Sequence, residues 1–334
     1  MLAAPGKRHE KRHAPAGGRA ATSHPKLPAT KLAGPAPQRS RYLQARTHRY
    51  DNPAGASLVL GQLGWICRII VHGSVVGLLL RLGSRDDACV VMIGDYGSAP
   101  DAAAASWVVE GLRGFAEGVL SLVPAGFDAY ARIFHPAWRW EPETRVLWRD
   151  VARANGRVAH RVMQWPAITG SYRFVHGAHQ PGIWDQEPLE GSLPEDLAPV
   201  LASLLARHTA TPGHCWFAVW DGYGCLASGT GDAPAFDIPN RRLLLFTGPV
   251  TAVVASLCTP PWWQSPSLWW PGDRAWCVET EVDLMSTYVG GTRQCIGELV
   301  AHNDLEAVIV DPADGVTWQS DVLNPLPARD GSSR

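Results

Sequence analysis

The sequence predicts an α+β fold for residues 92–334, with a mixed or antiparallel sheet and several packed helices. Some segments have apolar residues three and four positions apart, which is typical of helices. Between them lie segments in which apolar and polar residues alternate, which is typical of strands. The two kinds do not follow the regular βα order of a doubly wound sheet, which favours α+β. Hydrophobic residues make up 46% of the chain and charged residues 18%, which permits a substantial core. We expect one domain here.

Two helices are predicted in the first part of this domain. In residues 102–122, apolar side chains repeat at spacings of four and three and so share one face: Val108, Leu112, Phe115, Val119 and Leu122. Asp101 is placed to cap this helix. A second helix is expected over residues 145–154, with Thr144 as its N-cap.

The remaining elements alternate between strands and helices. Ser192 followed by Glu195 has the spacing of a capping box and predicts a helix start. Two further helices are predicted at 250–258 and 292–301, with loops at 163–193 and 260–273. Strands are predicted at 127–134, 214–220, 242–247, 275–284 and 305–310. Both faces of 214–220 are largely apolar, so we expect this strand at the centre of the sheet.

Residues 1–50 have a different composition. They carry eleven Lys or Arg residues and one acid, Glu10, which gives +10; since the whole chain is −1, the remainder is −11. The segment has few large apolar residues, so we expect a disordered basic tail. Such a tail could contact nucleic acid, and we expect nucleic-acid binding only there.

Residues 51–91 are apolar but of doubtful status. Arg68 lies in the middle of the apolar run at 57–82, and a central arginine costs about 2.5–3.5 kcal/mol on membrane insertion. We therefore do not expect a membrane span, although a weak anchor is one interpretation. Another is that translation starts near Met92, which precedes the first clear helix.

The chain has seven cysteines, at 67, 89, 215, 225, 258, 277 and 295. The number is odd, the spacings are wide and there is no CxxC pair, so we predict neither a zinc site nor a disulfide framework. A free cysteine in an apolar run behaves as a small core residue. We therefore expect a cytoplasmic protein with no metal and no cofactor.

Two motif matches are weak. Residues 222–227 fit GxGxxA, but a loop follows them where a dinucleotide site requires a helix, so a turn is the better interpretation. His176 and His179 lack further ligands at a fixed spacing, so we predict no metal site. The sequence has no GxSxG, HExxH or P-loop motif.

The predicted strand 275–284 carries the best candidate site. Alternation places Glu279, Glu281 and Asp283 on one face, roughly 6.5–7 Å from one to the next. Carboxylates at this spacing can perform acid–base chemistry or hold a cation. The alternative is that they form the solvated face of an antiparallel sheet.

Aromatic residues flank these carboxylates. The chain has 15 tryptophans, and Trp269 and Trp270 form a pair in the predicted loop before the strand. Together with Arg274 and Tyr288, they would suit a sugar, nucleoside or peptide ligand through stacking and hydrogen bonds. A structural role over the end of the sheet is the alternative.

Four strings, FDAYARIFHPA (127–137), CWFAVWDGYG (215–224), WWPGDRAWC (269–277) and STYVGG (286–291), resemble a group of uncharacterised actinobacterial proteins. The resemblance covers about residues 120–325. It implies a shared domain and a GC-rich bacterial source, and it carries over no activity, cofactor or site residue.

Two functions remain open. The first is a non-enzymatic binding or interaction domain that recognises an unknown small-molecule or protein ligand through the region 269–291. The second is a hydrolase-like enzyme that acts on a polar or sugar-like substrate through Glu279, Glu281 or Asp283. The enzyme requires paired carboxylates around a concave pocket, at least one of them desolvated.

Overall fold

The computed structural model describes residues 70–72, 75–77, 94–175 and 179–327. Strands β1 (Ile70–His72) and β2 (Val75–Gly77) form a short antiparallel pair. The basic tail predicted for residues 1–50, and most of the segment 51–91, lie outside the described residues.

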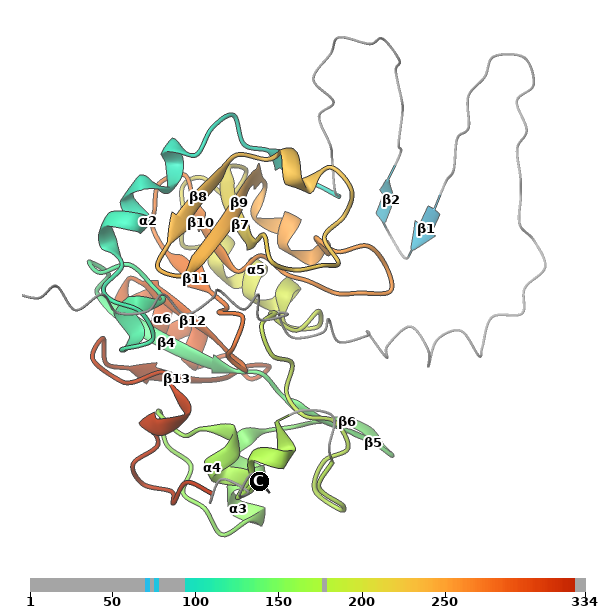
Figure 1. Cartoon of the computed structure of the whole chain (residues 1–334), viewed down its shortest axis with the longest axis vertical. Coiled ribbons are helices and arrows are strands. Elements are labelled where there is room, and N and C mark those ends of the chain that lie inside the picture. Colours follow the sequence, from blue (N-terminus) through green and yellow to red (C-terminus); the bar gives the residue numbers. More distant parts are fainter. Residues whose placement is uncertain (1–69, 73–74, 78–93, 176–178, 328–334) are drawn as a thin grey trace, which may run out of the picture. The chain divides into compact units, whose positions relative to one another are not determined.

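Nine antiparallel strands form the main sheet of the described chain. Figure 1 labels β4 and β7 to β13 of this sheet. Their order is β13-β4-β12-β11-β10-β7-β9-β3, and β8 also pairs with β9. The strands are β3 (Gly97–Ser98), β4 (Ala129–Phe134), β7 (Cys215–Trp220), β8 (Ala235–Ile238), β9 (Arg241–Gly248), β10 (Leu268–Pro271), β11 (Cys277–Glu279), β12 (Ser286–Gly291) and β13 (Glu306–Val310). The predicted α+β class is confirmed, and β7 lies inside the sheet as expected.

Helices cover both faces of this sheet. The first face packs on α5 (Ala198–Ala206) and α6 (Arg293–Val300) through a cluster that includes Phe217 and Trp269. The second packs on α2 (Ser106–Gly111) and on the 3-10 turns η1 (Ala103–Ala105) and η2 (Val119–Ser121). The other short turns are η3 (Tyr172–Phe174), η4 (Thr230–Asp232), η5 (Val250–Val254) and η6 (Trp318–Ser320).

A third apolar cluster lies beyond the end of the sheet formed by β4 and β13 (Figure 1). It contains α3 (Trp148–Ala154), α4 (Trp165–Thr169) and the hairpin of β5 (Ala137–Trp140) and β6 (Glu143–Val146). Its centre is a run of tilted indole contacts between Trp148, Trp165 and Trp184. The segment 163–193, predicted as a loop, therefore contributes a helix and core residues.

The long helix predicted at 102–122 is wrong in its second half. Asp101 is not its N-cap: the Oδ1 of Asp101 accepts a hydrogen bond from the amide of Ala103 at 2.8 Å, but the residues before η1 and α2 are Ala102 and Ala105, and neither element has a side-chain cap. Helix α2 ends at Gly111, and the chain then turns through Gly114 and Ala116, both with positive φ. A Cβ at Gly111 would lie 2.7 Å from that of Pro124, so the returning chain packs directly on this glycine.

Two predicted helix caps are also wrong. Thr144 lies within β6, and the amides at the start of α3 instead donate to the carboxylate of Glu306 on β13. Ser192 does not begin a helix, since α5 starts at Ala198. The Ser192 hydroxyl accepts a hydrogen bond from the amide of Ser265 at 2.9 Å and so joins two distant loops.

Candidate functional site

The strand predicted at 275–284 is much shorter in the structure, and only Cys277–Glu279 pair as β11. Glu279 lies opposite Leu268 of β10 and Tyr288 of β12, on the second face of the sheet. It is only 4% exposed, and its Oε2 has no hydrogen-bond partner among the described residues. A carboxyl group in this position is costly to ionise.

The chain turns immediately after β11. The amide of Leu284 donates to the carbonyl oxygen of Glu281 at 3.1 Å, and the amide of Asp283 donates to Glu281 Oε2 at 2.6 Å. This turn, rather than strand alternation, brings Glu281 and Asp283 toward the same cation. Arg241 Nη2 lies 2.6 Å from Glu281 Oε1, an ion-pair contact without hydrogen-bond geometry, and 2.8 Å from Asp283 Oδ2.

Arg241 reaches this turn from the start of β9. It follows the two-residue connection from β8, in which Asn240 adopts φ +63° and reverses the chain. The guanidinium carbon lies 5.3 Å from the ring centroid of Trp220 and 5.8 Å from that of Phe115. These rings cover one part of the cation, and its Nε is buried without a hydrogen-bond partner among the described residues.

A fourth carboxylate comes from the loop before α5. Glu190 interacts electrostatically with Asp283 and Glu281, and burial together with these charges raises its pKa to about 7. Its neighbour Gly191 donates its amide to the carbonyl oxygen of Leu284 at 3.0 Å, which fixes this loop against the turn. We call Glu190, Glu279, Glu281, Asp283 and Arg241 together the acidic site.

Burial raises the pKa of the two glutamates around the end of β11. The pKa of Glu279 is well above its usual value because the side chain is desolvated, and the charge of Glu281 adds to this effect. The pKa of Glu281 is also raised by desolvation, but Arg241 opposes the rise. In the acidic site, Glu190, Glu279 and Glu281 therefore have raised pKa values.

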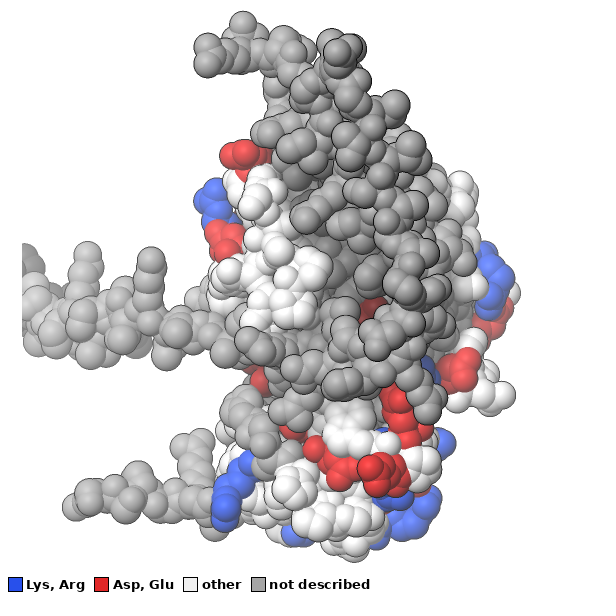
Figure 2. Space-filling view, turned by 90° about the vertical axis from the view of Figure 1, so that its right-hand side faces the viewer, with Lys and Arg blue, Asp and Glu red and all other residues white. Residues whose placement is uncertain are grey.

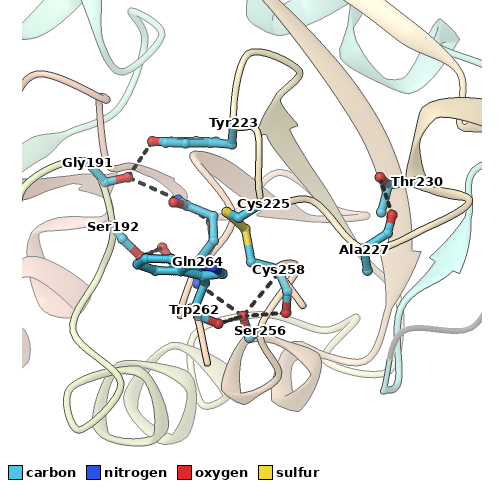
Figure 3. The surroundings of a disulfide bond; sticks show 11 residues. Gly191, Ser192, Tyr223, Cys225, Ala227, Thr230, Ser256, Cys258, Trp262 and Gln264 are labelled. Atoms are coloured by element: carbon cyan, nitrogen blue, oxygen red, sulfur yellow. Dashed lines mark hydrogen bonds between the residues drawn. A yellow bond between two sulfur atoms is a disulfide. The ribbon is translucent and has the colours of Figure 1, made fainter. Parts of the chain in front are cut away.

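Figure 3 shows how the loop before α5 is held in place. The Tyr223 hydroxyl donates to the carbonyl oxygen of Gly191 at 2.7 Å, and Gln264 Nε2 donates to the same oxygen at 3.1 Å. A Cβ at Gly191 would lie 2.6 Å from the carbonyl oxygen of Val282, so this contact requires glycine. Its φ of +74° requires glycine as well.

The aromatic residues predicted to flank the carboxylates do not form a recognition surface. Trp269 and Trp270 belong to β10 and are 0% and 1% exposed. Trp269 stacks on Phe217 on one face of the sheet, whereas Trp270 packs into the cluster on the other. Tyr288 is equally buried, because β12 lies inside the sheet. The prediction of a loop at 260–273 is wrong here.

Arg274 also lies away from the acidic site. It occupies the exposed turn before β11, whereas Glu281 follows the other end of the same strand. Its φ is +58°, and its guanidinium carbon lies 5.4 Å from the ring centroid of Trp107. Of the predicted residues, Glu279, Glu281 and Asp283 come together, and Tyr288 lies opposite Glu279 within the sheet.

A disulfide joins Cys225 and Cys258, which corrects the expectation that these cysteines are free (Figure 3). The bond links the turn after β7 with the segment after η5, across 33 residues. The turn predicted for residues 222–227 is confirmed, and it carries Cys225. Cys215, Cys277 and Cys295 are free and buried.

Sequence reasoning missed Arg241, Glu190 and Tyr223. Each comes from a different loop or strand end, and none forms a local motif with the others. The only available signal was charge. Glu279, Glu281 and Asp283 need a cation nearby, and a chain without lysine after residue 50 must supply an arginine.

Other features of the described chain lie elsewhere. A cavity of about 400 Å³ opens between β4, α6 and β13, with Phe127, Arg293 and Ile309 in its lining, and no residue of the acidic site lines it. Among the described residues, no three His, Cys, Asp or Glu side chains are grouped to hold a metal ion. No helix in the described part of the chain has the length and apolar character to cross a membrane.

Charge is mixed on the face drawn in Figure 2. Acidic and basic side chains lie next to each other around the described part of this face, and they do not form one broad patch of a single sign. Comparison of the chain with family models, curated proteins and solved structures gives no match. The resemblance of residues 120–325 to an actinobacterial group stays a prediction.

Proposed function

We propose that this domain is a binding module whose acidic site recognises the guanidinium or ammonium group of a peptide ligand. The observation that carries the proposal is the environment of Glu279. Its Oε2 is buried and has no hydrogen-bond partner among the described residues, beside a single arginine that already contacts Glu281 and Asp283. A guanidinium or ammonium group of a ligand would contact Glu281 and Asp283 beside Arg241.

The energetics favour a cationic ligand. An exposed ion pair contributes only about 0–1 kcal/mol, but hydrogen bonds to charged, partly desolvated groups contribute about 1.5–3 kcal/mol. Glu281 is largely desolvated but still partly exposed, so a cation that contacts it forms an interaction of the stronger kind, whereas Glu279 is buried. A bound cation also lowers the pKa of both glutamates, and binding should therefore release protons.

The test is titration calorimetry of the full chain with the peptide acetyl-Gly-Arg-Gly-amide. The matched probe replaces arginine with citrulline, which keeps the shape of the side chain and removes its charge. We expect the arginine peptide to bind at least about tenfold more tightly, which is 1.4 kcal/mol. Equal affinity for the two peptides would refute the proposal.

Variants locate the binding. Glu281→Gln should weaken binding of the arginine peptide about tenfold. Glu298→Gln is the matched control, because Glu298 lies on α6 and pairs with Arg207 and His208 away from the acidic site. If Glu298→Gln reduces affinity as much as Glu281→Gln does, the peptide binds by general charge attraction instead.

One observation favours a second function. The pKa of Glu190, about 7, suits a general acid or base, and the pKa of nearby Glu281 is raised less strongly than that of Glu279. Such carboxylates could hydrolyse a polar or sugar-like substrate. Hydrolysis of nitrophenyl glycosides that is abolished by Glu190→Gln would favour this enzyme over the binding module.

A further inference from the structure

We infer that the Cys225–Cys258 disulfide controls the acidic site, so that reduction of this bond weakens ligand binding without unfolding the domain. The inference rests on the proposed function, because its main readout is ligand affinity. It is carried by a chain of short contacts that leads from the two sulfur atoms to Glu190 and Glu281.

The first step of this chain links each cysteine to a residue that holds Gly191. Cys225 lies two residues after Tyr223, on the turn that follows β7. On the other side, Ser256 Oγ accepts hydrogen bonds from the amides of Cys258 and Gln264, both at 3.1 Å. The disulfide therefore links the segments that carry Tyr223 and Gln264 covalently, and Figure 3 shows these residues around it.

The second step links Gly191 to the acidic site. Tyr223 and Gln264 both donate to its carbonyl oxygen, so movement of either segment changes the position of this peptide. Its amide donates to the carbonyl oxygen of Leu284, and a Cβ at Gly191 would meet the backbone of Val282, so the peptide lies against the turn that carries Glu281. On its other side Gly191 is bonded to Glu190. The contact between Gly191 and Val282 leaves no room for a Cβ. A small displacement of the Gly191 peptide should therefore move both Glu190 and Glu281.

The bond can be broken by a dithiol. A thiolate of the reductant attacks one sulfur atom, and Cys225 is the more exposed of the pair, at 8% against 3% for Cys258. The Sγ–Sγ bond breaks, the dithiol becomes a cyclic disulfide, and its two electrons and two protons leave two protein thiols. Reduction removes the covalent link between the two side chains, so the turn that carries Tyr223 is then held to the segment that carries Gln264 only by noncovalent contacts.

The fold should survive this change. The same two segments are also joined by backbone hydrogen bonds, from Ala227 to the carbonyl oxygen of Leu257 at 3.0 Å and from Thr259 to that of Cys225 at 2.9 Å. These bonds do not depend on the oxidation state of sulfur. Neither cysteine belongs to a strand of the main sheet, although both are buried in the apolar cluster on its first face. We therefore expect a local rearrangement around Gly191.

The experiment compares the full chain before and after treatment with dithiothreitol, with thiol titration to establish that the bond is cleaved. Affinity for acetyl-Gly-Arg-Gly-amide should fall about tenfold on reduction. The double variant Cys225→Ala/Cys258→Ala should bind as weakly under both conditions. Cys295→Ala, which removes a buried free thiol, should keep the redox response.

Three outcomes overturn the inference. Unchanged affinity after complete reduction shows that the bond does not act on the site. Loss of the far-ultraviolet circular dichroism signal shows that the bond holds the whole domain rather than this region. If the oxidised protein does not bind the peptide, the proposed function has failed, and affinity can no longer test the inference. Hydrogen exchange of the oxidised and reduced protein then tests whether the disulfide acts on the acidic site. Faster exchange confined to residues 188–193 and 281–285 on reduction supports the inference, and uniform exchange contradicts it.

Discussion

Tyr223 donates its hydroxyl hydrogen to the carbonyl oxygen of Gly191 across 32 residues of sequence, at a distance of 2.7 Å. Tyr223→Phe removes this bond and leaves Gln264 as a second donor to the same oxygen. We expect the variant to lose about 1 kcal/mol of unfolding free energy, the usual contribution of one hydrogen bond. Urea denaturation measures the change.

Tyr96→Phe is the matched control for this substitution. The Tyr96 hydroxyl is buried and has no hydrogen-bond partner among the described residues, so its removal should leave stability unchanged or increase it. Equal destabilisation by the two substitutions would mean that the Gly191 contact contributes nothing specific.

Glu306→Ala should destabilise the third apolar cluster. The carboxylate accepts hydrogen bonds from the amides of Trp148 at 2.6 Å and Arg149 at 2.8 Å, and so caps α3. Loss of a helix cap costs about 0.5–2 kcal/mol. Thr144→Ala, at the position that the sequence predicted as the cap, should change stability little. The prediction fails if the threonine variant is the more destabilised of the two in thermal melts.

Trp269→Ala should reduce stability severely. The indole is fully buried between Phe217 and Trp276, and large-to-small substitutions of this kind cost about 3–5 kcal/mol. The partly buried Trp262 provides the comparison, with a smaller loss expected for Trp262→Ala. Guanidinium denaturation of both variants checks this. If the Trp269→Ala protein were as stable as the parent, Trp269 would not be a core residue, and its predicted role in a binding surface would be favoured.

The contribution of Glu190 to stability should fall as pH rises above about 4.5. The pKa of Glu190 is about 7 in the folded protein and close to its ordinary value of 4.5 when unfolded. Between these values the folded protein binds more protons, so a rise in pH favours unfolding, and Glu279 acts in the same direction. Glu190→Gln should therefore gain stability relative to the parent more at pH 8 than at pH 5.

Glu298→Gln should change the pH dependence of stability in the opposite direction to Glu190→Gln. Hydrogen bonds from Gln294 and His208 lower the pKa of Glu298, so its carboxylate stabilises the folded protein above pH 4.5. This variant should lose stability at neutral pH and approach the parent in acid. Parallel pH profiles for the Glu190 and Glu298 variants would contradict the assignment of Glu190 as a group with a raised pKa.

Local patterns predicted several elements because their physical cause is local. The alternation in 214–220 and 305–310 corresponds to β7 and β13, and Thr292 caps α6 by accepting from the amide of Cys295. The prediction of a helix from residue 102 was wrong beyond Gly111. That glycine packs against Pro124, which the chain brings back to it only in the folded protein. No window of sequence contains that contact.

The candidate site also combines features that the local sequence predicts with features that depend on tertiary contacts. The sequence by itself determined the acidic stretch of Glu279, Glu281 and Asp283 and the α+β class, since charge and apolar periodicity are properties of neighbouring residues. Only the tertiary structure decided that Arg241 neutralises two of these carboxylates, that Glu190 joins them and that Cys225 bonds Cys258. These partners are 33 or more residues apart, and desolvation exists only once the chain has closed around them.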